Sequence, residues 1–210
     1  MEYLYELHKK YYKIEFPRPV RSISSAPFNG GFGYADTYVN REVPKSYNSD
    51  PVVEIEKFLR EEDISALHTV VTMTAVNVST LEREKSVVGA YSMEIFLTAG
   101  FENAVSIGNR NHLFGTVNLC LVTDLPLSNA ASVNLLQSMV EAKSQCMNDF
   151  EIRDRETGKK APGTSTDTVS IFILSEETSI KYAGRITEYG HHASELVYSA
   201  LARSMSKNKI

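Results

Sequence analysis

The sequence predicts an α/β-type, mixed α+β domain in which helices cover a mixed, partly antiparallel sheet. Segments rich in β-branched residues dominate the first half of the chain, and strands alternate with helical segments in the second half. With 210 residues, of which 42% are hydrophobic, the chain suits a single layered domain over residues 1–210. The order of the strands does not follow from these patterns.

Short strands are expected at the start of the chain. Alternating apolar and polar residues predict strands at 3–8, 11–16 and 20–24. Pro17 and Pro19 should stop the second of these, because proline has no N–H group for a sheet hydrogen bond.

A glycine-rich segment and a helix come next. The glycines of FNGGFGYADTYVNREV permit backbone conformations closed to other residues, before a strand at 35–40. The segment SDPVVEIEKFLREED predicts a helix over 51–61, with Ser49 or Asp50 as its cap and Pro51 in its first turn.

The remaining segments predict further strands and two helices. HTVVTMTAVNV and SVVGAYSMEIFLTAG, separated by the charged STLEREK, indicate a long hairpin. GTVNLCLVTD and TDTVSIFIL predict two more strands. Between these two a helix of about 20 residues is expected, capped by Ser128 or Asn129, and a final helix covers roughly 189–206.

Charge and hydropathy limit the partners. The formal net charge is −4, with 22 basic and 26 acidic residues and no sustained charge run, which argues against nucleic acid and anionic membranes. No stretch approaches the roughly 20 apolar residues that span a bilayer. The segment MEYLYELHKKYYKIEF lacks the pattern of a signal peptide, so a cytoplasmic location is expected.

Cysteine and histidine positions give no sign of a metal site. Cys120 and Cys146 fall inside apolar patterns, which favours core positions over a disulfide or zinc site. No metal-ligand spacing joins the histidines, so a zinc-water mechanism is not expected. The histidines are His8, His68, His112, His191 and His192.

Six short stretches, taken in order, resemble one enzyme family. They are NGGFGYADTYVNREV, TAGFENAVSIG, GTVNLCLVTDLPLSNAASVN, EAKSQC, GTSTDT and YAGRITEYG. In order and spacing they are similar to the adenosylcobinamide amidohydrolase (CbiZ) family of corrinoid salvage, over about residues 28–200. Two histidines in YGHHASE depart from the family pattern, so His191 and His192 are not taken as catalytic.

The resemblance implies a hydrolase that cuts the amide between the corrin ring and its aminopropanol arm. The products would be adenosylcobyric acid and aminopropanol, and no cofactor is expected beyond the corrinoid substrate. Two alternatives stay open: a corrinoid-binding protein without activity, and an amidase for another bulky amide. A homo-oligomer is compatible with the sequence.

A lysine interrupts the apolar face of the expected long helix. At 100° per residue, Lys143 falls among the apolar side chains, whereas Glu141 points to the opposite face. On general grounds Lys143 would sit at the rim of the core with its ammonium in water. The resemblance, which includes EAK, favours a desolvated lysine of lowered pKa that acts as base or hydrogen-bond donor. Glu141 is a further catalytic candidate, although its direction favours a role in fixing the helix end or a neighbouring loop. Lys143→Met should then spare or raise stability while activity is lost.

The stretch GTSTDT has two interpretations. Without the resemblance it is a turn entering a strand, in which Gly163 permits the turn. With it, Ser165 and Thr164 are candidate nucleophiles, Asp167 would orient a partner, and Gly163 and Thr166 would contact the substrate.

Amide-binding groups complete the candidate site. A corrinoid is large, flat and edged with amides, so a glycine-lined and asparagine-rich cleft suits it. Exposed turn asparagines are the simpler explanation for several of these residues. The candidates are Asn29, Gly30, Gly31, Asn40, Asn103, Gly115, Thr116 and Asn118.

Overall fold

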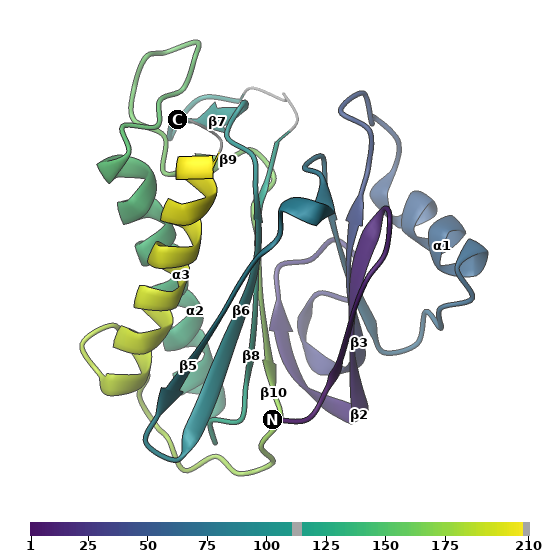
Figure 1. Ribbon diagram of the computed structural model, residues 1–210, viewed down its shortest axis with the longest axis vertical. Helices are drawn as coiled ribbons and strands as arrows, with labels where there is room; N and C mark the ends of the chain where they lie inside the picture. Colours follow the sequence, from purple (N-terminus) through teal and green to yellow (C-terminus); the bar gives the residue numbers. More distant parts are fainter. Residues whose placement is uncertain (111–114, 208–210) are drawn as a thin grey trace.

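One mixed sheet forms the centre of the protein. The computed structural model describes residues 1–110 and 115–207 (Figure 1). The sheet has the strand order β4-β3-β2-β10-β8-β6-β5, with β1 paired to β2. Its strands are β1 (Leu4–Leu7), β2 (Tyr11–Ser24), β3 (Gly31–Glu42), β4 (Thr69–Thr74), β5 (Glu82–Val88), β6 (Tyr91–Ala99), β8 (Val117–Thr123) and β10 (Thr168–Ile173). The β3–β4 and β8–β10 pairs are parallel and the others antiparallel, which confirms the mixed sheet.

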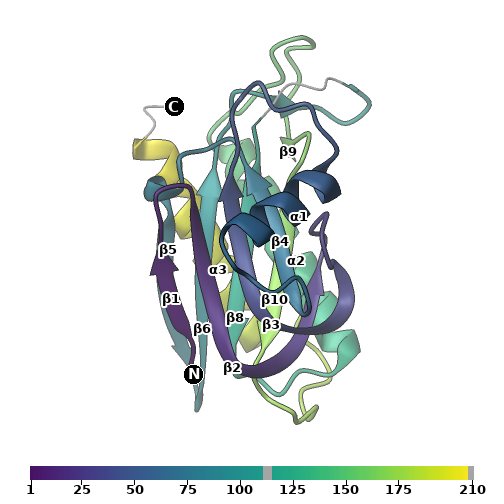
Figure 2. The same cartoon turned by 90° about the vertical axis from the view of Figure 1, so that its right-hand side faces the viewer.

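The sheet folds so that its two halves face each other (Figures 1 and 2). An aromatic-rich core fills the space between them, with Tyr12 and Tyr38 from β2 and β3 meeting Phe96 and Phe172 from β6 and β10. Aromatic side chains bury large apolar areas, and the Tyr12–Tyr38 and Tyr38–Phe172 pairs adopt tilted arrangements. The inner faces of both halves are therefore apolar around these rings.

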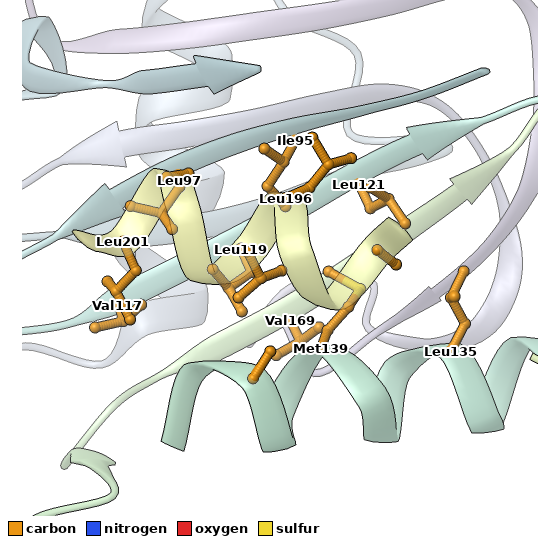
Figure 3. Packing of buried hydrophobic residues seen from close by; sticks show 14 of the residues in the cluster. Ile95, Leu97, Val117, Leu119, Leu121, Leu135, Met139, Val169, Leu196 and Leu201 are labelled. Carbon is orange, nitrogen blue, oxygen red and sulfur yellow. The ribbon is translucent and has the colours of Figure 1, made fainter. Parts of the chain in front are cut away.

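Helices cover both outer faces. Helices α2 (Asn129–Asp149) and α3 (Glu188–Lys207) pack on β6, β8 and β10. In Figure 3, Leu135 and Met139 of α2 and Leu196 of α3 meet strand residues such as Leu119. Helix α1 (Pro51–Glu61) covers the other half through Ile55 and Leu59. The layers thus run helix pair, sheet half, sheet half, helix.

Short elements complete the fold. A one-turn helix, η1 (Val78–Thr80), follows β4. Strands β7 (Ala104–Val105) and β9 (Gly163–Thr164) form a separate two-stranded sheet. No helix in residues 1–110 and 115–207 is long and apolar enough to cross a membrane.

Predicted helix ends are confirmed. Helix α1 begins at Pro51, and the Asp50 carboxylate accepts hydrogen bonds from the amides of Val52 and Val53. Ser128 caps α2 by accepting from the amide of Ala131. Satisfied N-terminal amides stabilise each helix start by about 1 kcal/mol. Cys120 and Cys146 are free and buried, as their apolar patterns indicate.

The predicted long hairpin is wrong. Strand β4 pairs with β3 at one end of the sheet, whereas the hairpin is formed by β5 and β6 at the other end. Its turn contains Gly89 at φ +58°, a left-handed conformation that favours glycine. β-branched composition identifies strands and leaves the choice of partner open, because partners are selected by packing.

The predicted break at the prolines is also wrong. Residues 11–24 form the single strand β2, and pairing with β3 is interrupted between Glu15 and Val20. Pro17 and Pro19 lie inside this irregularity, where a ladder N–H is not required.

Candidate active site

A cavity of about 630 Å³ lies at the end of the sheet where β8 and β10 begin. Residues 165–168, which lead into β10, form one wall, so we call it the 165–168 cavity. Gly115 and Thr116, which precede β8, lie beside them. The opposite wall contains Val43, Tyr47 and Met73. Because β8 and β10 are parallel neighbours, their entry loops meet at the same edge.

Lys143 and Asp167 form an ion pair at this edge. Their side chains are 9% and 13% exposed. Lys143 comes from the sheet-facing side of α2, and Asp167 from the loop before β10. Neither of the sequence-based interpretations of Lys143 included this partner. In this geometry Lys143 Nζ donates a hydrogen bond to the carboxylate, so the structure presents Lys143 as a hydrogen-bond donor to Asp167.

Asp167 accepts hydrogen bonds from several groups. Its Oδ2 receives Lys143 Nζ and the amide of Thr164 at 3.1 Å. Its Oδ1 receives the amide of Val117 at 2.9 Å and the hydroxyl of Thr164 at 2.5 Å. Charge-assisted bonds of this kind are about twice as strong as neutral ones. These bonds hold the loop before β10, the start of β8 and helix α2 together. We call Lys143, Asp167 and Thr164 the Lys143 cluster.

Gly163 allows the pair to form. A Cβ atom built on Gly163 would lie 2.5 Å from Lys143 Nζ and would also collide with Asp167 Oδ2. Only a residue without a side chain leaves room for the ion pair. The structure therefore gives Gly163 a role in the close approach of Lys143 and Asp167.

Hydroxyl groups next to the Lys143 cluster face the cavity. Ser165 and Thr166 are exposed and line the 165–168 cavity. Ser165 Oγ accepts from Asn103 Nδ2 at 2.9 Å, and Thr166 Oγ1 donates to the Gly115 carbonyl at 3.0 Å. Asn103 also donates to that carbonyl at 2.7 Å. The loop before β8 and the loop before β10 are thereby held together around Gly115.

Asn40 and Asn118 lie beneath the cavity rather than in it. Both are fully buried, and Asn118 Nδ2 donates to Asn40 Oδ1 at 2.8 Å. Thr116 and Thr168 hydroxyls donate to Asn118 Oδ1, and Asn40 Nδ2 donates to Thr98. A buried amide that meets its partners rigidifies its surroundings. These asparagines act as a polar floor that joins the two sheet halves.

Other predicted residues lie apart from this edge. Asn29, at φ 52°, donates to the carbonyls of Ala66 and Thr69 and so shapes a turn next to Gly30 and Gly31. None of the three lines the 165–168 cavity.

Glu141 lies on the other side of α2, as its helical angle indicates. Its carboxylate accepts from Gln137 at 3.0 Å and pairs with Arg185 at 3.5 Å. His191 pairs with Glu195 on α3, and His192 contacts Ser86. His112 lies outside the described residues.

A second carboxylate holds the neighbouring loops. Asp154 is 1% exposed, and its Oδ2 accepts from the Ser106 amide and hydroxyl and from Asn109 at 2.8–2.9 Å. Its Oδ1 accepts from the amide of Glu156. These hydrogen bonds, led by the Ser106 amide, hold the pKa of Asp154 well below its ordinary value.

Sequence reasoning missed the opposite wall of the cavity. Tyr47, Asn48 and Ser49 lie between β3 and α1 and carry no recognisable motif. Met73 belongs to β4, whose position beside β3 was not foreseen. Only the tertiary fold brings these residues opposite the GTSTDT loop.

The fold and the site define a class of protein. A hydroxyl bonded to a carboxylate that is itself oriented by a lysine, next to a cavity, is compatible with the hydrolysis of an amide or ester. Solved structures match the fold. The PH0078 protein of Pyrococcus horikoshii OT3 has a TM-score of 0.52 and a β-aminopeptidase of Burkholderia sp. one of 0.54, each at 12% identity. The matches cover 97% of this chain and 83% and 82% of those chains.

The chain belongs to the adenosylcobinamide amidohydrolase (CbiZ) family, whose model matches residues 2–210. It is 29% identical to the adenosylcobinamide amidohydrolase of Methanosarcina mazei, over 84% of this chain and 86% of that protein. It is also 25% identical to an uncharacterised protein of Methanocaldococcus jannaschii, over 70% of this chain and 63% of that one. The predicted family is thus confirmed. The chain is an amidohydrolase of corrinoid salvage that acts on the aminopropanol amide of adenosylcobinamide.

Proposed function

We propose that cleavage of this amide takes place at the Lys143 cluster, at the edge of the 165–168 cavity. The single observation that carries the proposal is the contact chain from the Thr164 hydroxyl to Asp167 and from Asp167 to Lys143. A nucleophile within hydrogen-bond reach of a base, with that base oriented by a third group, is the usual equipment for acyl transfer.

In this proposal Thr164 Oγ1 attacks the carbonyl carbon of the amide and its proton passes to Asp167. The proton moves on to the nitrogen of aminopropanol as the carbon–nitrogen bond breaks, which leaves an ester on Thr164. Water then attacks the ester and restores the hydroxyl, releasing adenosylcobyric acid. Lys143 holds the Asp167 side chain in place through the ion pair, with Asp167 Oδ1 toward the Thr164 hydroxyl.

Ser165 is the rival nucleophile, because it is exposed on the cavity wall while Thr164 is half-buried. We prefer Thr164 because its hydroxyl lies 2.5 Å from a carboxylate oxygen. Ser165 and Thr166 then serve to bind the substrate amide.

Two substitutions distinguish the nucleophile from a residue that binds the substrate amide. Purified wild type, Thr164→Val and Ser165→Ala are incubated with adenosylcobinamide, and adenosylcobyric acid is followed by mass spectrometry. Thr164→Val, which keeps the shape and loses the hydroxyl, should lower turnover by at least about a hundredfold. Ser165→Ala should lower turnover by a smaller factor. Ser206→Ala, which changes an exposed serine near the end of α3, serves as the control.

The outcomes discriminate between the candidates. An ester trapped on residue 164 supports the mechanism, and one on Ser165 assigns the attack to the serine. Turnover within twofold of wild type in both variants would place the chemistry elsewhere. Corrinoid binding without any product in the wild type would favour a binding protein.

The proposal includes metal-free chemistry. In residues 1–110 and 115–207, no three His, Cys, Asp or Glu side chains gather as a metal site, and the carboxylate of the cluster is occupied by lysine and amide donors. EDTA should therefore leave turnover unchanged. Strong inhibition that zinc reverses would refute this part.

The proposal also covers cellular setting and partners. Two free, buried cysteines suit a reducing compartment, which supports the cytoplasm. The net charge of −4 supports a small-molecule substrate over nucleic acid. Size-exclusion chromatography will decide whether the chain forms a homo-oligomer.

A further inference from the structure

A second cavity, of about 610 Å³, adjoins the 165–168 cavity. It is bordered by residues 99–102, which follow β6, and we call it the 99–102 cavity. Both cavities include Ala75 and Gly115 in their walls. The two spaces are therefore neighbours across Ala75 and Gly115, and Gly115 contacts the loop that carries the proposed cleavage site.

Gly115 borders both cavities and leaves room for the Asn103 side chain. Its carbonyl accepts hydrogen bonds from Asn103 and Thr166 at 2.7 and 3.0 Å, and the Thr164 hydroxyl, which donates to Asp167, lies 3.0 Å from it. A Cβ on Gly115 would collide with the Asn103 side chain. Because Gly115 and Ala75 border both spaces, a ligand that fills one cavity lies next to the other.

The 99–102 cavity carries both donors and acceptors. Lys45 and Glu102 form an ion pair at 2.6 Å, with side chains 65% and 60% exposed. Arg155 is exposed and lies near enough to Glu102 to help Lys45 lower the pKa of that carboxyl. Asn77 completes the polar rim. Its Oδ1 caps η1 by accepting from the Ser79 amide.

We infer that the 99–102 cavity binds the carboxamide-bearing edge of the corrin ring while the aminopropanol amide lies in the 165–168 cavity. The inference rests on the proposed function. Pockets of 300–1,000 Å³ enclose ligands of ordinary drug size, and an adenosylated corrinoid is larger, so it needs more than one such space. Carboxamides both donate and accept hydrogen bonds, which matches a rim of guanidinium, ammonium, amide and carboxylate groups.

The test uses Arg155→Ala and Lys45→Ala, with Arg185→Ala as a control for loss of an exposed arginine on another face. Steady-state kinetics with adenosylcobinamide give KM and kcat. Equilibrium dialysis of adenosylcobyric acid, followed by corrin absorbance, gives a Kd that does not depend on cleavage. Thermal unfolding checks that each variant is folded.

Arg155→Ala should raise KM and Kd by about tenfold, because a charge-assisted hydrogen bond is lost, and should leave kcat within twofold of wild type. Lys45→Ala should act in the same direction, and Arg185→Ala should change neither value. KM and Kd within twofold of wild type in both variants would overturn the inference while leaving the proposed function intact. A fall in kcat alone, or no binding of adenosylcobyric acid to the wild type, would also overturn it.

A wild type that binds adenosylcobyric acid and cleaves nothing would refute the proposed function. The Kd values of the variants would then decide the inference by themselves.

Discussion

Breaking the ion pair of Lys143 with Asp167 should cost stability as well as activity. The two side chains are 9% and 13% exposed, so Lys143→Met leaves a carboxylate that water hardly reaches. Removing one partner of a buried pair costs about 3–5 kcal/mol. Asp167 keeps hydrogen bonds from the Thr164 amide and hydroxyl and from the Val117 amide, which places the expected loss at the low end, about 3 kcal/mol.

Such a loss is measurable by urea unfolding followed by circular dichroism. In a chain of this length it corresponds to a fall in thermal midpoint of about 6–12 °C. Lys57→Met, in which an exposed lysine of α1 is changed in the same way, should stay within about 0.5 kcal/mol of wild type. The ion pair thus reverses the expectation, drawn from the sequence alone, that Lys143→Met spares stability.

A double-mutant cycle isolates the pair. Asp167→Asn and Lys143→Met together should cost less than the sum of the single variants, by about 1–3 kcal/mol, because the double variant buries no unpaired charge. Additivity within about 0.5 kcal/mol would show that the two side chains do not interact, and would remove Lys143 from the proposed site. The double variant should remain inactive.

Three further predictions concern the supports of the site. Gly163→Ala should displace Lys143 from its partner and lower turnover at least tenfold, as measured by aminopropanol release; a fully active variant would contradict the close-approach role. Asn118→Leu should lower the free energy of unfolding by about 1–3 kcal/mol, because the threonine donors and Asn40 lose their buried partner, and urea unfolding would test this. Asp154 has a lowered pKa in the folded state, so its stabilising effect is present above the ordinary value of about 4 and is lost as the pH falls below it. Unfolding measured from pH 7 to pH 2 should therefore lose less stability in Asp154→Asn than in wild type; equal slopes would refute the role assigned to these hydrogen bonds.

Local patterns were sufficient for much of the fold. Cap residues and apolar spacing located α1 and α2, because these signals act within a few residues of the helix. The angle of 100° per residue correctly separated Lys143 from Glu141 on α2. The ordered short stretches identified the family, which the match over residues 2–210 confirms.

Strand pairing was decided by the tertiary structure. β4 lies beside β3, and β5 lies beside β6 at the far edge, although the sequence favoured joining β4 to the segment that contains β6. A β-branched strand fits many partners locally, and the packing of both sheet faces selects among them.

The candidate site, like the fold, could be predicted from the sequence only in part. The sequence itself singled out Lys143, because a lysine on an apolar helix face is visible in one dimension. Thr164, Ser165 and Asp167 became candidates through the family resemblance, since GTSTDT without it is interpreted as a turn. The ion pair that joins Lys143 to Asp167 could not be predicted from the sequence. The two residues are 24 positions apart and meet only when α2 packs on the sheet. The burial of a side chain and its hydrogen-bond partners depend on which surfaces the fold brings together. For this reason Asn118 is part of the buried polar floor, whereas Ser165 faces the cavity.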